Sequence, residues 1–356
     1  GGVGGIYFAD GTGAAQYAGY QNYNHSGDKF TWGTAGAIRM HLDASGLDLN
    51  DTPLLNVGES GNDWDTTSLR SAAPVDIQGG YVNGGGAPYD GVVDAGGGGN
   101  WTTIQAGDDV LDAGNFTMLV KSGTYAESPT ISTNDAKVVI EPGTDIQGVI
   151  TLSGSNISLI FGSGCDIDGI TITGSDCYIN GGGWNTISDG GTARHGFYIT
   201  GSDNIVENIA VQTTGGGGGA YEAIEIATGD RNTIKNVNII NSDAVAIYIP
   251  SGSTHNVLDG VHISACDGRG MQISGSETRV VNCYVGNSAS DGIQLAAGGS
   301  NCVVVGCMVQ DNAAGASIDV TVSAEDNVVV GNRTDGAPSD ASGTSTVASN
   351  ETTAFS

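Results

Sequence analysis

Five carboxylates in the second half of the chain have the residue type and the setting for glycoside chemistry. They stand at or just before short apolar segments, where a turn passes into a strand: Glu222, Glu225, Asp243, Asp267 and Asp291. Hydrolysis of a glycosidic bond needs two carboxylates about 5 to 9 Å apart, and strands stacked about 4.8 Å apart bring such pairs together across one or two rungs. These five acids are therefore the candidate catalytic residues.

A structural role is the alternative for part of this group. Asp-Gly pairs such as Asp267-Gly268 and Asp291-Gly292 are ordinary turn formers. Glu222 and Glu225 are not turn residues, so they are harder to explain by the backbone alone. Glu222 and Glu225 are for this reason the stronger candidates.

Lyase chemistry would use the acids differently, as a calcium cradle beside a basic residue that abstracts a proton. Four residues would imitate that arrangement: Asp243, Asp267, Asp291 and Arg269. The sequence phrases of pectate lyases and polygalacturonases are absent around them. The lone Arg194-His195-Gly196 is more typical of a chain corner with a satisfied histidine.

Aromatic and amide side chains form a second candidate group, because aromatic faces stack on sugar rings while amides and carboxylates bind hydroxyl groups. They fall in two rows of outward positions, Tyr198 to Asp319 on one strand of the repeat and Ala210 to Met308 on another. The candidate ligand-binding residues are Tyr198, Tyr248, His262, Gln272, Tyr284 and Gln294. The alternative is an ordinary solvated sheet face.

The elements that position these residues must be repetitive and rich in turns. The 356 residues include 60 glycines and 7 prolines, yet 38% are hydrophobic, which excludes collagen and a disordered tail. A net charge of −28 argues against nucleic-acid partners and anionic membranes, and no apolar run reaches the roughly 18 to 20 residues that span a bilayer. The six cysteines form no CxxC pair, and we expect neither a metal nor a cofactor.

A repeat is visible from small-residue turns that contain a glycine. Successive turns are 20, 27, 28, 23, 23 and 24 residues apart, at Gly154, Gly174, Gly201, Gly229, Gly252, Gly275 and Gly299. Apolar residues stack in columns between these turns, for example Val206, Ile234, Leu258, Val280 and Val304. A second column contains Ile209, Val237, Val261, Cys283 and Cys307, and a third contains Phe197, Ile224, Ile247, Met271, Ile293 and Ile318.

The pattern inside each repeat is that of strands joined by sharp bends. Apolar and polar residues alternate, as in Val237-Asn238-Ile239 and Ile247-Tyr248-Ile249, which is the period of a strand. Asn or Gly, which tolerate a left-handed backbone, precedes the second column at Asn208, Asn236, Gly260, Asn282 and Gly306. Columns of Ile and Val exclude a leucine-rich repeat. Cys283 and Cys307 fit as small buried hydrophobes, with a bridge between coils as the alternative.

The segment Leu119-Val120-Lys121-Ser122-Gly123-Thr124-Tyr125 lies directly upstream of these coils and resembles the "VxPGTY" start of pectate-lyase-like β-helices. Ser122 stands where that family often has Pro. The resemblance implies an all-β, right-handed, single-stranded parallel β-helix whose open end is covered by a short helix, which we expect within residues 103–113. Asp108 and Asp109 then fit the acidic preference of a helix N-terminus.

Strand-turn-strand phrases occupy the start of the chain, such as Tyr20-Gln21-Asn22-Tyr23-Asn24-His25-Ser26 and Arg39-Met40-His41-Leu42-Asp43. They resemble short β-repeats of bacteriophage tail fibres and tailspikes. We expect an N-terminal attachment or extension region at 1–60, a Gly/Asp-rich linker at 61–100, a capped β-helix at 101–336 and a loose Ser/Thr-rich tail at 337–356. The resemblance implies a parallel homotrimer on a virion, in contact with other virion proteins through its N-terminal region.

The sequence thus favours a phage tailspike or tail fibre, located on the particle surface, that recognises a host cell-surface polysaccharide. Depolymerisation of that polysaccharide is an optional further activity. Two other classes stay open, a secreted polysaccharide lyase or hydrolase and a purely structural head-fibre or decoration protein. No nucleic-acid partner and no membrane insertion are expected.

Overall fold

The computed structural model describes residues 2–8, 19–34, 37–44, 46–48, 89–111, 116–182, 186–188, 195–212, 221–310, 312, 315–321 and 323–352. The chain divides into two compact units, Gly1–Gly80 and Tyr81–Ser356. Most of the linker predicted at 61–100 lies outside the described residues, as do Arg194 and the last residues of the tail. In the described part of the chain, no helix is long and apolar enough to cross a membrane.

The first unit contains an antiparallel sheet in which neighbouring strands follow one another in sequence, as the strand-turn-strand phrases predicted. Its strands are β1 (Val3–Phe8), β2 (Gly19–Asn24), β3 (Lys29–Thr34), β4 (Ala37–Asp43) and β5 (Gly46–Asp48). The register of β3 on β4 shifts between Trp32 and Gly33.

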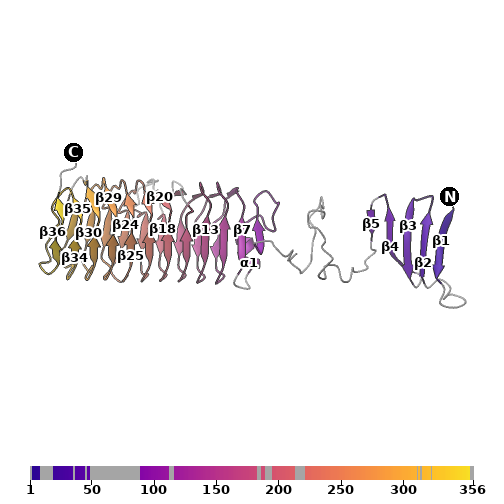
Figure 1. The fold of residues 1–356 in the computed structure, drawn as a ribbon, viewed down its shortest axis with the longest axis horizontal. Helices are drawn as coiled ribbons and strands as arrows, with labels where there is room; N and C mark the ends of the chain where they lie inside the picture. The colour runs from indigo at the N-terminus through magenta and orange to yellow at the C-terminus, as the bar shows by residue number, and fades with distance from the viewer. Residues whose placement is uncertain are drawn as a thin grey trace. The chain divides into compact units, whose positions relative to one another are not determined.

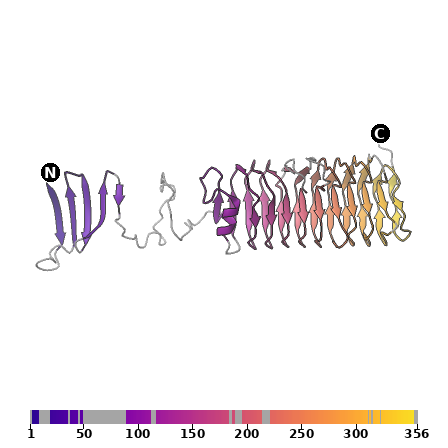
Figure 2. The same ribbon diagram turned by 180° about the vertical axis from the view of Figure 1, so that it is seen from behind.

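The second unit is a parallel β-helix in which three sheets run along one axis (Figures 1 and 2). The 12-stranded sheet contains β6 (Gly91–Val93), β7 (Thr117–Val120), β10 (Lys137–Ile140), β13 (Ser158–Phe161), β16 (Tyr178–Asn180), β19 (Ile205–Glu207), β22 (Thr233–Lys235), β25 (Val257–Asp259), β28 (Arg279–Val281), β31 (Val303–Val305), β34 (Val328–Val330) and β37 (Thr346–Ala348).

The other two sheets complete each coil. The 11-stranded sheet contains β8 (Thr124–Tyr125), β11 (Asp145–Ile146), β14 (Asp166–Ile167), β17 (Thr186–Ser188), β20 (Ala210–Gln212), β23 (Asn238–Ile239), β26 (His262–Ile263), β29 (Tyr284–Gly286), β32 (Met308–Gln310), β35 (Arg333–Thr334) and β38 (Glu351–Thr352). The 10-stranded sheet contains β9 (Thr130–Ile131), β12 (Ile150–Leu152), β15 (Ile170–Ile172), β18 (Phe197–Ile199), β21 (Ile224–Ile226), β24 (Ile247–Ile249), β27 (Met271–Ile273), β30 (Ile293–Leu295), β33 (Ile318–Val320) and β36 (Ser339–Asp340).

The predicted columns are confirmed by the strand registers. Successive members of the first column are paired: Val206 with Ile234, Ile234 with Leu258, Leu258 with Val280 and Val280 with Val304. All five side chains are fully buried. The column that begins at Phe197 is confirmed in the same way, as is burial of the column that contains Cys283 and Cys307. All six cysteines are buried and form no disulfide with one another, so the hydrophobic role holds and no bridge joins the coils.

Two kinds of corner residue permit the coils to stack. The predicted bends at Asn208, Asn236 and Asn282 have φ of 58°, 50° and 55°, and Gly260 and Gly306 adopt the same left-handed backbone. The second kind of corner residue is a glycine at a point where two coils approach closely. A Cβ on Gly201 would collide with the carbonyl oxygen of Gly174 in the preceding coil. Gly174 and Gly229 are equally close to the preceding turn, so these glycines of the repeat allow neighbouring turns to touch.

Buried asparagines tie each coil to the next at the turn before the 12-stranded sheet. Asn204 Nδ2 donates to the Gly174 carbonyl at 3.2 Å, while its Oδ1 accepts from the Cys177 N–H at 2.8 Å. Asn232 and Asn256 repeat both hydrogen bonds one and two coils later. All three side chains are fully buried. Since buried backbone groups need partners, this ladder supplies them where the sheet is interrupted.

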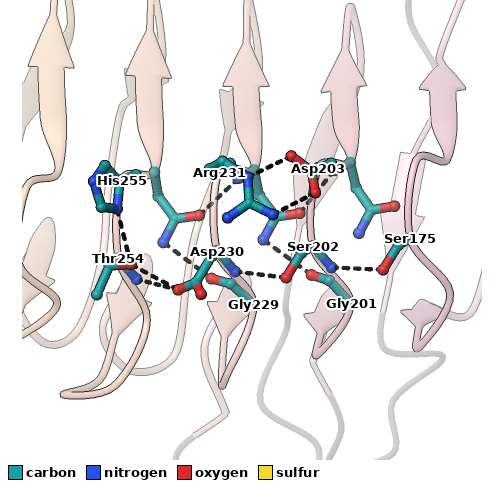
Figure 3. Close-up of polar contacts among 12 residues, drawn as sticks. Ser175, Gly201, Ser202, Asp203, Gly229, Asp230, Arg231, Thr254 and His255 are labelled. Carbon is teal, nitrogen blue, oxygen red and sulfur yellow. Dashed lines mark hydrogen bonds and ion pairs between the residues drawn. The ribbon is translucent and has the colours of Figure 1, made fainter.

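A parallel set of contacts covers the solvent side of the same turns (Figure 3). The Asp230 N–H donates to Ser202 Oγ at 3.1 Å, and the Ser202 N–H donates to Ser175 Oγ at 3.2 Å. Arg231 forms an ion pair with Asp203 on the previous coil. These contacts are more exposed than the asparagines, so their contribution to stability is smaller.

A short helix, α1 (Ile104–Val110), lies at the first coils, within the range predicted for the cap (Figure 1). The interpretation of Asp108 and Asp109 as N-terminal charges is wrong, because no acidic residue lies in its first turn. Asp108 is buried and accepts from the N–H and Oγ of Ser132. Glu127 takes the N-terminal place instead, accepting from the backbone N–H groups of residues 104 and 105.

The coils extend further at both ends than expected. β6 already pairs with β7 within the predicted linker, and β36, β37 and β38 continue all three sheets beyond residue 336. The Ser/Thr-rich composition of this end does not prevent pairing, because backbone groups alone make the ladder. Asn350 Nδ2 also donates to the Val329 carbonyl, as Asn332 Nδ2 does to the Val304 carbonyl one coil earlier.

Replacing one buried apolar side chain of a coil by a charged side chain tests this fold. Val206→Asp places an unpaired charge at a site with 0% exposure and should cost several kcal/mol, roughly 3 or more, whereas Ile205→Asp, 40% exposed on the same strand, should have little effect. Thermal melting followed by far-UV circular dichroism measures both. Equal melting temperatures for the two variants would contradict the inward and outward assignment.

Removal of one asparagine side chain tests the ladder. Asn232→Ala leaves the Asn204 N–H and the Gly201 carbonyl without partners, at about 1 to 3 kcal/mol for each buried group. Asp203→Asn, which removes only the exposed ion pair and suits the left-handed backbone there, should leave the melting temperature nearly unchanged. A larger loss in Asp203→Asn than in Asn232→Ala would mean that the outer contacts hold the turns.

Candidate functional site

Three ionisable side chains converge on the outer surface of the 10-stranded sheet, at β18 and β21. His195 lies two residues before β18, Glu222 lies two residues before β21, and Glu225 is the central residue of β21. Because Phe197 pairs with Ile224, His195 and Glu222 occupy the same position in adjacent coils. We call His195, Glu222 and Glu225 the His-Glu-Glu cluster.

The distances in this cluster are short. His195 Nδ1 lies 3.3 Å from Glu222 Oε2, and His195 Nε2 lies 3.3 Å from Glu225 Oε2. One ligand atom from each residue lies within 4.8 Å of the other two. The exposed fractions of the three side chains are 17 to 19%, so the cluster is shielded from water but still reachable from the surface.

Side chains along β21 alternate between the core and the outer surface. Glu225 faces outward because Ile224 and Ile226 on either side of it are fully buried. Burial raises the pKa of the Glu225 carboxyl; His195 opposes this shift and Glu222 adds to it. His195 Nδ1 is buried and, although it lies 3.3 Å from Glu222 Oε2, the contact does not have the geometry of a hydrogen bond. The cluster therefore combines crowded carboxylates with an imidazole nitrogen that lacks a hydrogen-bond partner.

Tyrosines surround the cluster. The ring of Tyr198 lies 5.2 Å from that of His195 in a tilted arrangement, and the ring of Tyr221 lies 5.1 Å away, edge to face. Tyr198 and Tyr248 are the neighbours of Glu225 on the two adjacent strands, as the outward row predicted. A surface of aromatic rings beside carboxylates can bind a sugar, move a proton or hold a cation.

The other predicted acids belong to different surroundings. Asp291 is 7% exposed and its Oδ2 accepts from Arg269 Nε at 3.0 Å, while its Oδ1 accepts from the Ala316 N–H at 2.9 Å. Asp291 is therefore engaged in holding a turn and in an ion pair. Asp243 is half-buried and Asp267 is exposed. Among the described residues, only Glu222 and Glu225 of the five join a cluster of possible ligands.

The predicted ligand-binding residues divide between two sheets. Gln272 and Gln294 continue the row of Tyr248 along the 10-stranded sheet. Both amides already have partners, since Gln272 accepts from Arg269 and Gln294 donates to Asp291 and Asp319.

His262 and Tyr284 lie on the 11-stranded sheet, with stacked rings 4.5 Å apart. Asn238 contacts His262 Nδ1 at 3.0 Å, and Gln310 donates to the hydroxyl of Tyr284 at 3.2 Å. These two rings thus form a separate platform, away from the row that contains Tyr198.

Two residues of the site escaped the sequence analysis. The sequence pattern around His195 is typical of a corner with a satisfied histidine, and Tyr221 lies outside the two predicted outward rows. The available signal was their register: His195 precedes Phe197 by the same two residues by which Glu222 precedes Ile224. Stacking of those two apolar residues places the histidine directly beside the glutamate.

No curated protein matches the chain. Solved structures with limited similarity include an alginate lyase from Paenibacillus sp. str. FPU-7, with TM-score 0.47, 17% identity and coverage of 65% of this chain and 92% of the other. Open reading frame 18 of Geobacillus virus E2 has TM-score 0.46 and 13% identity, covering 63% of this chain and 52% of the other.

The A-module of the Azotobacter vinelandii mannuronan C-5 epimerase AlgE6 has TM-score 0.41 and 13% identity, covering 65% of this chain and 70% of the other. Similarity at this level says nothing about a shared ligand or activity. The family described as "Right handed beta helix region" matches residues 147–334. The match spans more than half of the chain and agrees with the three parallel sheets, so the chain belongs to the family of right-handed β-helix proteins.

Proposed function

We propose that this protein is a receptor-binding spike or tail fibre on the surface of a bacteriophage particle, and that it recognises a polysaccharide of the host cell surface. The observation that carries this proposal is the row Tyr198, Glu225, Tyr248 on adjacent strands, with Tyr221 beside it. Half-buried tyrosines next to carboxylates offer both the stacking face and the hydrogen-bond acceptors that a sugar ring uses.

The negative charge of the chain limits the class of polysaccharide that this surface can bind. The net charge is −28, Glu225 is the central residue of the row, and Glu222 lies beside it, so this surface repels polyanions unless a cation bridges them. Neutral hexoses, or sugars with few carboxylates, suit this face better. In the described part of the chain, Arg269 contacts Gln272 of the row, and it is already paired with Asp291.

The N-terminal sheet supports attachment to other virion proteins. Ile6, Phe8, Phe30 and Leu42 share one face of this sheet and are 38 to 63% exposed. Exposed apolar patches of this kind are typical of protein interfaces. Together with the resemblance of these strands to phage β-repeats, the patch supports docking to the particle, and assembly as a homotrimer is part of the proposal.

Cleavage of the bound polysaccharide is a second candidate function, because one carboxylate oxygen of Glu222 lies within 4.8 Å of one of Glu225, close to the lower limit of the separation that glycosidases use. Glycosidases place two carboxyl groups about 5 to 9 Å apart on either side of the scissile bond. A secreted lyase or hydrolase would use the same face without the virion, whereas a purely structural fibre would use neither the tyrosines nor the glutamates.

Loss of one aromatic ring should weaken glycan binding. Tyr248→Ala removes a stacking face and should lower affinity about fivefold, given that such a contact contributes about 1 kcal/mol, with little change in melting temperature because the ring points outward. Biolayer interferometry against a panel of bacterial capsular and O-antigen polysaccharides measures this. Tyr178→Ala, outward on the 12-stranded sheet, is the matched control. Equal binding by both variants would place the receptor site elsewhere.

Cleavage has its own test. Glu225→Gln keeps the size of the side chain but removes its charge, so it should abolish release of reducing ends while binding to the polysaccharide persists. Reducing-end assays on each polysaccharide that binds, followed over hours, measure the release. If the wild-type protein releases none, or the Glu222→Gln/Glu225→Gln double variant releases as much as wild type, the cleavage function is wrong and recognition alone stands.

A further inference from the structure

The His-Glu-Glu cluster carries more negative charge than its own histidine can balance. Two carboxylates face one imidazole, so even a protonated His195 leaves a net charge of −1 among three side chains that are less than a fifth exposed. The Asp291 carboxylate on the same sheet differs, because Arg269 neutralises it. The cluster is therefore a place where a further positive charge would be favourable.

The donor atoms of the His-Glu-Glu cluster determine which class of cation it prefers. The buried Nδ1 of His195 has no hydrogen bond, and imidazole nitrogen beside carboxylate oxygen suits first-row transition metals. Calcium and magnesium prefer sites made of oxygen alone. Ligand atoms within 4.8 Å of one another need only small side-chain rotations to reach the roughly 2.0 to 2.2 Å bonds of zinc.

We propose that His195, Glu222 and Glu225 bind a divalent first-row transition metal ion, with Zn²⁺ as the representative. Three protein ligands leave a position of the metal open, as in zinc sites that bind water or substrate. Backbone pairing of β18 with β21 holds the three ligands at their spacing before any metal arrives. This proposal differs from the expectation of a metal-free chain, and it does not depend on glycan binding.

The proposed site also changes how the glutamates are understood. Each ring nitrogen of His195 lies 3.3 Å from one of the two carboxylates, so the imidazole ring bridges Glu222 and Glu225. A glycosidase pair keeps that space for the sugar and for water. As metal ligands, the same two glutamates need no such space, because one ligand atom from each of the three residues already lies within 4.8 Å of the other two.

Zinc binding to the full chain is measured by isothermal titration calorimetry at pH 7, after removal of metals with a chelating resin. We expect about one Zn²⁺ per chain in the wild type, with affinity lowered at least tenfold in His195→Asn and in Glu222→Gln/Glu225→Gln. Zinc should also raise the melting temperature of the wild type only. Melting without zinc verifies that the variants fold.

The matched control is His255→Asn. His255 also contacts a glutamate, Glu277, but as a single exposed pair, and Asn suits the left-handed backbone at this position. This variant should bind zinc like the wild type. Absence of zinc uptake by the wild type, or uptake unchanged in His195→Asn, would overturn the proposal. Displacement of zinc by equimolar Ca²⁺ or Mg²⁺ would overturn the assignment to a transition metal. No glycan is present, so these results are independent of the receptor function.

Discussion

The in-register pairing of each coil with the next is the constraint on which this structure depends. The strands of the β-helix use their backbone N–H and C=O groups in hydrogen bonds with the neighbouring coils. The chain must therefore return to the same register after each coil. The turn before the 12-stranded sheet is where that return is enforced, since Asn204, Asn232 and Asn256 bind backbone groups of the previous coil from within the core. A coil that slipped by one residue would lose these bonds and turn its apolar side chains outward.

The candidate site follows from this register. Residues that are far apart in the chain but equivalent in adjacent coils are brought to the spacing of neighbouring strands, about 4.8 Å. His195 and Glu222 meet for this reason alone, and Glu225 joins them because alternation turns it to the same surface. Repetition thus produces a cluster that no continuous motif encodes. The same rule arranges the tyrosines of the row and, on another sheet, the stacked rings of His262 and Tyr284.

Sequence reasoning succeeded where the determinants are local and repeated. The buried columns and the left-handed corners at Asn208, Asn236 and Asn282 were predictable because inward positions favour Ile and Val and sharp bends favour Asn and Gly. It failed where a distant residue decides. The acceptor for the first helical N–H groups is Glu127, which only the folded coil brings to α1, so Asp108 and Asp109 were misassigned. His195 was missed because its partner is one coil away and coil lengths vary.

The two ends of the β-helix differ in how they meet solvent. At the first coils, α1 packs with its buried Ile104 and Gly107, whereas β37 and β38 at the other end of the described coils have mostly exposed side chains. In a stack where each coil contacts only its neighbours, a coil with a neighbour on both sides opens less readily than one without. The strands β18 and β21 lie between β15 and β24 in the 10-stranded sheet, so the cluster has paired strands on both sides. Local opening at either end of the described coils therefore leaves the three side chains of the cluster in place.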